Sequence, residues 1–419
     1  MPTTPSGDPR VDSRARVVTH PSIFLALNVP YGAISGYLTV AIAYALAQSG
    51  MSVARIGLLI ATYGVPQTLK FLWAPIIDTT LTRKRWYFIG TSLTAAGAVA
   101  MAACSTRATA FGVLTVASLV ASLASSFSGM SVESLLAHST PEPLKGRAGG
   151  WLQAGAFAGG GIGGGAALWL AQRVSAPWLT GVALAACFML CCTALLTFDE
   201  PHIAHESRAV GRKLIGVLRD LWQVVRVRSG YLALLIVFLP IGTGAASNFW
   251  SAVADEWHAS AATVALVNGA LSGIVCAAGC LLGGSISDRI NRRFAYVLFG
   301  SLLALCGLAM AVYPHTERAY SVFTLTYAFI NGMCFAGFSA VTLEAIGRGA
   351  AATKYNLYAS LSNMPINYMT ALEGWAHSRW GTNGLLYFEG IMSAVSLFIF
   401  GAAILLSAQR IAPPAPESA

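Results

Sequence analysis

Long apolar segments recur along this sequence, each about 20 residues long and separated from the next by a polar stretch. A helix of that length crosses the hydrocarbon core of a bilayer, which is about 30 Å thick. Lipid offers no hydrogen-bond partner to backbone N–H and C=O groups, so such segments are helical, and none shows the alternation of a barrel strand. The sequence therefore predicts an all-α integral membrane protein.

Twelve such segments are present, at residues 23–47, 54–78, 86–104, 109–137, 149–171, 176–198, 230–252, 262–287, 294–313, 319–345, 353–377 and 384–408. Only 10% of the residues are charged, against about a quarter in a soluble domain, which excludes a water-soluble fold. The longest polar stretch separates the first six segments from the last six. We expect a cytoplasmic tail at 1–22, a six-helix half at 23–198, a cytoplasmic linker at 199–229, a second six-helix half at 230–409 and a cytoplasmic tail at 410–419.

Basic residues are distributed unevenly between the two sides of the predicted membrane. Most of the 26 Lys and Arg residues lie on the side of the N-terminus, and the positive-inside rule places that side, with both termini, in the cytoplasm. This asymmetry explains the net charge of +9, and the loops are too short to dock nucleic acid, so no nucleic-acid partner is expected. All eight cysteines fall within predicted segments, which argues against a disulfide framework or a zinc site. We expect no metal and no cofactor.

The two halves share a repeated pattern, which predicts pseudo-symmetry between them. Asp78 ends the second segment and Asp288 ends the eighth, and each is followed by a cluster of arginines. Glu133 and Glu344 lie near the matching ends of the fourth and tenth segments. Both pairs are separated by about 210 residues, half of the chain.

The loop after the eighth segment reads Gly-Ser-Ile-Ser-Asp-Arg-Ile-Asn-Arg-Arg, from Gly284 to Arg293. It resembles the signature loop of the major facilitator superfamily, and the resemblance covers nearly the whole chain. It implies two six-helix halves around one central cavity. Rocking of the halves in that family opens the cavity to one side of the membrane at a time.

The first two segments resemble one branch of that superfamily, the peptide–acetyl-coenzyme A branch. The matching stretches are Asn-Val-Pro-Tyr-Gly at residues 28–32 and Thr-Leu-Lys-Phe-Leu-Trp-Ala-Pro at residues 68–75. The branch includes AmpG-type muropeptide permeases and siderophore permeases of the rhizobactin and pyochelin type. The resemblance implies a bacterial cytoplasmic (inner) membrane protein that imports such a solute by symport.

Lys70 is the only lysine or arginine well inside a predicted segment. A cation at that depth costs about 2.5–3.5 kcal/mol, so it should face a cavity or a partner. Tyr63, Gln67 and Lys70 share one helical face. We hypothesise that Lys70 attracts an anionic group of a solute. The alternative is a structural lysine that caps carbonyl groups or pairs with Glu133.

Further polar residues follow the faces of segments that line the cavity in this superfamily. Polar groups inside a membrane need partners or water, so a continuous polar face favours a wet pathway. Contacts between helices are the alternative role for each of them. Besides Tyr63, Gln67 and Lys70, the predicted substrate-binding residues are Asn28, Tyr31, Asn248, Asn331, Asn356, Asn363 and Asn367.

Charged residues at the cytoplasmic ends of the segments form a predicted latch of ion pairs that holds the halves together on that side and breaks when the cavity opens. Orientation in the membrane is the alternative explanation of these charges. The predicted latch residues are Asp78, Arg83, Arg85, Arg147, Asp288, Arg289, Arg292, Glu344 and Lys354.

Three carboxylates within or near the segments are candidates for proton coupling, Glu133, Glu373 and Glu389. A carboxylate removed from water takes up a proton more readily, which suits it to carry one. Glu373 and Glu389 lie near the outer ends of their segments, so placement at the surface is equally compatible with the sequence.

These observations predict a secondary active transporter, a proton-coupled importer of an anionic small molecule that acts as a monomer in the lipid bilayer. The sequence contains no nucleophile elbow, no metalloprotease helix motif and no phosphate-binding loop, so we expect neither an enzyme nor an ATP-driven pump. The alternative is a transporter-shaped sensor or scaffold that binds a ligand without moving it.

Overall fold

A computed structural model of the chain describes residues 20, 22–104, 110–139, 145–197, 219, 237–346 and 360–409. Every regular element in these ranges is helical, and they contain no β-strand. The all-α fold predicted from the apolar segments is confirmed. Within the same ranges, nine helices are long and apolar enough to cross a membrane.

The first half of the chain contains α1 (Ile23–Gly36), η1 (Tyr37–Ile42), α2 (Ala43–Gln48), α3 (Val53–Leu69), η2 (Lys70–Leu72), α4 (Ala74–Thr79), α5 (Arg83–Cys104), α6 (Phe111–Ser139), α7 (Lys145–Gly161), η5 (Ile162–Ala166), α8 (Ala167–Ala171), α9 (Trp178–Cys192) and η6 (Thr193–Thr197). The second half contains η7 (Ala245–Phe249), η8 (Ala254–Trp257), α12 (Ala261–Val264), η9 (Ala265–Leu271), α13 (Ser272–Arg289), α14 (Arg292–Val312), α15 (Glu317–Ile346) and α17 (Asn363–Gln409). The segments η1, η5 and η9 are π-helical turns that continue the α-helices next to them.

The predicted segment 54–78 is not one continuous helix. The α-helix ends at Leu69, a 3₁₀ turn runs from Lys70 to Leu72, and helix α4 begins again at Ala74. Pro75 in the first turn of α4 explains the break, because a proline lacks the N–H that the preceding helix needs and clashes with the carbonyl four residues earlier. Lys70 therefore lies at a break in the helix.

The described part of the predicted segment 230–252 is also interrupted. Val237 and Phe238 are helical, but the chain then leaves helical geometry around Pro240 and passes through Gly242 (φ 62°) and Gly244 (φ 67°). Both values lie in the left-handed region that glycine adopts without a steric penalty. The 3₁₀ turn η7 follows, so a short non-α segment takes the place of the expected continuous helix.

Helix α17 comprises the last two predicted segments. Its backbone leaves helical geometry at Gly381 (φ 68°, ψ −168°), and the chain reverses there. The element is therefore two membrane-spanning helices joined by a tight turn. With the two interrupted segments and both parts of α17, the described helices are consistent with the twelve predicted segments.

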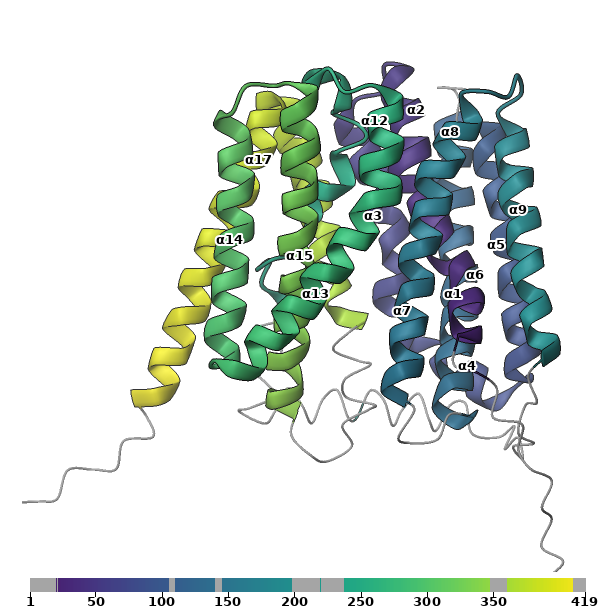
Figure 1. Ribbon diagram of the computed structural model, residues 1–419, viewed down its shortest axis with the longest axis horizontal. Helices are drawn as coiled ribbons and strands as arrows, with labels where there is room; N and C mark the ends of the chain where they lie inside the picture. Colours follow the sequence, from purple (N-terminus) through teal and green to yellow (C-terminus); the bar gives the residue numbers. More distant parts are fainter. Residues whose placement is uncertain are drawn as a thin grey trace, which may run out of the picture.

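The helices form two groups that lie side by side, α1 to α9 in one and α12 to α17 in the other (Figure 1). Helix α1 begins and α17 ends at the same end of the bundle, the lower end in Figure 1. We call this end the terminal face and the opposite end the distal face. The turns at Ser49–Gly50 and at Gly381 lie on the distal face.

Two pairs of elements carry the principal contacts between the halves, α3 with α17 and η5 with η9. At the second contact a Cβ atom added to Gly269 would lie 2.3 Å from Cα of Gly165. The two backbones therefore touch without intervening side chains. Both pairs bring the halves together in the part of the bundle toward the distal face.

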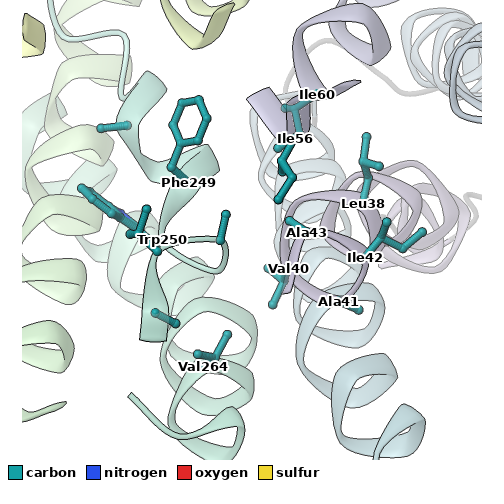
Figure 2. Packing of buried hydrophobic residues seen from close by; sticks show 14 of the residues in the cluster. Leu38, Val40, Ala41, Ile42, Ala43, Ile56, Ile60, Phe249, Trp250 and Val264 are labelled. Carbon is teal, nitrogen blue, oxygen red and sulfur yellow. The ribbon is translucent and has the colours of Figure 1, made fainter. Parts of the chain in front are cut away.

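One cluster of buried apolar side chains continues across the two halves. Figure 2 shows Ile56 and Ile60 of α3 on one side and Phe249 and Trp250 of the second half on the other. Phe249 packs where a side chain on Gly57 would lie, 2.6 Å from its ring. Burying apolar side chains here closes the distal part of the molecule between the halves.

Candidate functional site

A charged pair inside the first half joins Lys70 to Glu133. Lys70 stands at the break after α3, and its Nζ donates to Oε1 of Glu133 on α6 at 3.3 Å. The lysine side chain is 19% exposed and the glutamate side chain 44% exposed. The pairing anticipated in the alternative reading of Lys70 is thus present, and both charges remain accessible.

The accessible surface of Glu133 belongs to a face of α6 that lipid does not cover. Val113, Val116 and Val120 are strongly exposed and mark the lipid-facing side of this helix. At about 100° per residue, Glu133 lies roughly 140° around the helix from Val120. Gly129, one turn before Glu133, contacts the ring of Tyr31 on α1. Glu133 therefore points toward the space between α1, α3 and α6.

A hydrogen-bonded cluster lies beside this ion pair. The hydroxyl of Tyr31 donates to Oε1 of Gln67 at 3.2 Å, and Nε2 of Gln67 donates to the carbonyl of Ser122 at 3.0 Å and to Oγ of Ser125 at 3.2 Å. The Tyr31 side chain also lies close enough to Lys70 to interact with it electrostatically. We call Tyr31, Gln67, Lys70, Ser122, Ser125 and Glu133 the N-half polar cluster.

Aromatic rings lie next to the N-half polar cluster. Trp73, three residues after Lys70, donates its indole N–H to Oγ of Ser126 at 3.0 Å and stacks on Phe127. Trp86 stacks on the same ring, with centroids 5.0 Å apart. The rings fix the 3₁₀ turn that carries Lys70, so its ammonium group is held by packing as well as by Glu133.

Two predicted binding residues of the first half contribute to packing between helices. Asn28 is buried and donates to the carbonyl of Leu152 at 2.8 Å, which ties α1 to α7. Tyr63 is 6% exposed, and its carbonyl accepts from Oγ of Ser122 at 2.5 Å. Of the predicted stripe, Gln67 and Lys70 are the members that the structure places in the N-half polar cluster.

The predicted asparagines of the second half occupy different environments. Asn248 donates to Oγ1 of Thr370 at 2.9 Å, and Asn363 donates to the carbonyl of Ser360 at 3.2 Å. Asn367 crosses between the halves and donates to Oγ1 of Thr68 at 2.8 Å. Asn331 lies against Gly244, and its Oδ1 has no partner among the described residues. Asn356 lies outside the described residues.

The two carboxylates predicted near the outer ends of their segments are buried in the second half, 0% exposed for Glu373 and 2% for Glu389. Tyr327 on α15 donates its hydroxyl hydrogen to Glu389. Neither oxygen of Glu373 has a partner in the described parts of the chain. Surface placement, the alternative considered for both, does not occur.

The predicted latch falls largely on side chains that the structure does not describe. Asp78, Arg147 and Glu344 lie in helices whose side chains at those positions are outside the described set, and Lys354 lies outside it altogether. Of the others, Arg83 is buried and its Nε donates to Oγ of Ser134 at 2.5 Å. The remaining members are exposed on the terminal face: Arg85, Asp288, Arg289 and Arg292.

A polar network on the distal face was not predicted. Gln48 of α2 donates to both carboxylate oxygens of Asp255, at 2.8 and 2.7 Å, and so joins the two halves. The next residue, Glu256, binds His377 at 2.9 Å and Thr382 at 2.5 Å, on either side of the turn at Gly381. In the sequence, the available signal was the adjacent acidic pair Asp255–Glu256 together with His377 in a later segment.

Glu256 is ionised readily despite its partial burial. Burial acts to raise the pKa of its carboxyl, but the hydrogen bonds from His377 and Thr382, with the electrostatic influence of His377 and His315, outweigh that effect. The pKa of Glu256 therefore lies below its ordinary value. An ionised Glu256 holds η8 against the turn of α17.

Two groups of membrane-spanning helices lie side by side, closed together toward one face, with a polar cluster between helices of the first group, and this arrangement is typical of a membrane transporter. The family model described as Major Facilitator Superfamily matches residues 24–367. This chain belongs to the major facilitator superfamily. No curated protein sequence matches it closely enough to be counted as a relative.

Solved transporter structures share the fold. The nucleoside transporter NupG superposes with a TM-score of 0.70 at 14% identity, over 91% of this chain and 98% of that one. A POT family transporter in complex with a thioalcohol-conjugated peptide gives 0.69 at 11% identity, over 94% and 96%. The xylose transporter XylE from E. coli, partially occluded and inward open, gives 0.69 at 12% identity, over 91% and 97%.

Proposed function

We propose that this chain is a secondary active transporter that imports an anionic small molecule together with protons across the bacterial cytoplasmic membrane. Muropeptides, siderophores and similar conjugates are the substrate classes. The terminal face, with both termini, lies in the cytoplasm, and the chain acts as a monomer. In this assignment the structure represents a state closed toward the outside.

The observation that carries the proposal is the accessible Lys70–Glu133 pair in the membrane interior. An ammonium group at this depth is retained only where it has a partner or a wet cavity. Its polar partner among the described residues, at 3.3 Å, is a carboxylate that is 44% exposed, and another anion can take the place of that carboxylate. A carboxylate or phosphate on the solute would compete with Glu133 for Nζ of Lys70.

The surroundings of Lys70 fit a solute with polar groups besides its anion. The hydroxyl of Tyr31 and the amide of Gln67 lie beside the pair and can rearrange toward hydroxyl or amide groups of a ligand. Trp73 offers an aromatic face next to them. Asn248 and Asn331 extend polar groups into the second half. These residues, with Asn363, Asn367 and Asn356, stay candidates for contact with the solute.

Proton coupling is proposed from the carboxylates. Glu133 has Lys70 as its counter-ion in this state, whereas Glu373 and Glu389 are buried in the second half without a cation as partner in the recorded contacts. A carboxylate removed from water is neutralised by a proton when no cation is available. All three remain candidates, and the buried pair has the stronger need for a proton.

Uptake into proteoliposomes tests the proposal. A radiolabelled muropeptide and a radiolabelled ferric siderophore should accumulate when the pH gradient drives protons in the same direction, and a neutral pentose should not. Lys70→Ala should lower uptake of the accepted anion at least tenfold, and Lys70→Arg should retain part of it. Arg173→Ala, which removes the same charge from beside Trp169 on the distal face, is the control and should transport normally.

Full transport by Lys70→Ala would contradict the role given to Lys70. Binding of either labelled solute without accumulation, with or without the gradient, would instead support a sensor or scaffold.

A further inference from the structure

The interior of the second half contains carboxylate oxygens that no donor satisfies. Glu373 is 0% exposed, and both of its oxygens lack a partner among the described residues. Glu389 is 2% exposed, and its Oε2 lacks a partner in the same set. The two side chains are close enough for their charges to interact. Buried polar atoms are nearly always hydrogen-bonded, so these exceptions require an explanation.

Within the described ranges, the residues that interact with the two carboxylates include no lysine or arginine. Helix α14 contributes Cys306 and the space at Gly307, and α15 contributes Tyr327 and Cys334. The segment η7 contributes the backbone N–H of Ala246, which lies near the Glu389 carboxylate. His377, one turn from Glu373 along α17, is bound to Glu256.

Counting hydrogen-bond donors and acceptors assigns different protonation states to Glu373 and Glu389. Glu389 receives a hydrogen bond from the Tyr327 hydroxyl and lies near the Ala246 N–H, and this donor environment suits a carboxylate. Glu373 receives none, and a carboxyl group without donors is tolerated in an apolar interior only when it is neutral. A protonated Glu373 would itself be a donor, and Oε2 of Glu389 is the acceptor still without a partner.

We propose that Glu373 and Glu389 form a carboxyl pair that holds one exchangeable proton inside the second half, and that η7 transmits the state of this pair to the central polar residues. The inference rests on the proposed transport function and specifies its coupling site. The proton comes from the aqueous phase and returns to it, converting one carboxylate to a carboxyl group and back.

The segment η7 is attached to α17 beside the pair. Asn248 donates to Thr370, which precedes Glu373 by one helical turn, and Ala246 lies near Glu389. Gly244, with its left-handed backbone, allows the chain to rotate at the start of the segment. Loss of the proton leaves two adjacent carboxylates that repel each other, so the contacts that hold η7 must rearrange. Asn248 then moves in response to the proton, although the proton and the solute occupy separate sites.

Infrared difference spectroscopy of the purified full-length protein, titrated with acid and base, tests the pair without any solute. The wild type should show one protonated-carboxyl C=O band that shifts in deuterium oxide and titrates. Glu373→Gln should abolish this band. Glu389→Gln should keep a protonated-carboxyl band that no longer titrates, because Glu373 then has no charged neighbour. Glu256→Gln is the matched control and should leave the wild-type band unchanged.

The transmission through η7 has its own readout, hydrogen–deuterium exchange of residues 242–250, corrected for the intrinsic effect of pH on exchange. The exchange should change with the same midpoint as the infrared band, and the change should disappear in Glu373→Gln. Residues 292–303 of α14 serve as the internal reference. If Glu373→Gln fails to fold, Glu373→Asp should move the midpoint and the band frequency together.

A wild-type spectrum without the band, or a band that survives in Glu373→Gln, would overturn the carboxyl pair. Disappearance of the band when sodium chloride replaces choline chloride would also overturn it and would assign the site to Na⁺. If the corrected hydrogen–deuterium exchange rate of residues 242–250 does not change during the titration, the link to η7 is wrong. None of these results depends on uptake, so an intact band in a protein that moves no solute contradicts only the proposed transport.

Discussion

Asn367 on α17 donates to Oγ1 of Thr68 on α3 at 2.8 Å, across the boundary between the two halves and across 299 positions of sequence. Gly64, one turn before Thr68, makes room for it, because a Cβ atom there would lie 1.8 Å from Oδ1 of Asn367. The contact exists only while α3 and α17 are packed together. Its strength therefore contributes to the balance between the distally closed state and a distally open one.

Asn367→Ala should shift that balance toward the open state. The net value of one such hydrogen bond is about 0.5–1.5 kcal/mol, which corresponds to a population change of roughly 2–10-fold. Hydrogen–deuterium exchange of residues 37–48 and 254–264, on the two sides of the distal closure, should accelerate by that factor. Thr62→Ala, which removes a hydroxyl bonded within α3 itself, is the control. Equal exchange in both variants would show that the contact does not influence opening.

The Lys70–Glu133 pair should behave as a coupled unit in stability measurements. Removing one charge leaves the other in the membrane interior without a counter-ion. The destabilisations caused by Lys70→Ala and by Glu133→Ala should therefore add up to more than the destabilisation of the double variant. We expect a coupling energy of about 0.5–3 kcal/mol in thermal unfolding of the detergent-solubilised protein. Additive effects of the two substitutions would mean that the contact at 3.3 Å contributes nothing.

Gly269→Ala should disturb the η5–η9 contact, because the new methyl group would meet Cα of Gly165 at 2.3 Å. Overpacking of this kind costs about 1–3 kcal/mol, and the melting temperature should fall. Gly160→Ala is a matched control in the neighbouring helix, where an added Cβ has no atom within 4 Å. It should be neutral or stabilise the helix by about 0.5–1 kcal/mol. A stable Gly269→Ala variant would show that η5 and η9 need not touch.

The distal network should weaken in acid. The pKa of Glu256 is lowered in the folded protein from an ordinary value of 4.5, so its contribution is complete above that pH and is lost as the pH falls through the lower folded value. Thermal unfolding of the wild type should therefore lose stability below about pH 4.5 relative to Glu256→Gln. The advantage of the wild type over Glu256→Gln should be present at pH 5 and should shrink as the pH falls further. An advantage that grows as the pH falls would reverse the sign and contradict the argument.

The fold was largely predictable from the sequence, because segment length and lipid chemistry leave one solution. The two interruptions were not. Pro75 and Pro240 are visible in the sequence, but prolines also occur within continuous membrane helices, as Pro30 and Pro66 do here. What distinguishes the broken segments is the neighbouring structure that satisfies the freed backbone groups, and this depends on other helices.

The candidate site was predictable in part. Lys70 stood out because an isolated cation is rare in a membrane segment, and the structure supplies its partner and the cluster around it. The burial of Glu373 and Glu389 depends on how the two parts of α17 rotate against α14 and α15, which periodicity along one helix does not specify. The link from Gln48 to Asp255 joins residues 207 positions apart, and no local pattern identifies such a pair.

The meeting of Gly165 and Gly269 has a mechanical consequence. Where two backbones touch at glycines, no side chains interlock. The halves can therefore tilt at that point without any side chain having to change its rotamer. The η5–η9 contact can therefore act as a pivot between the halves, while the interdigitated side chains of α3 and α17 resist their separation.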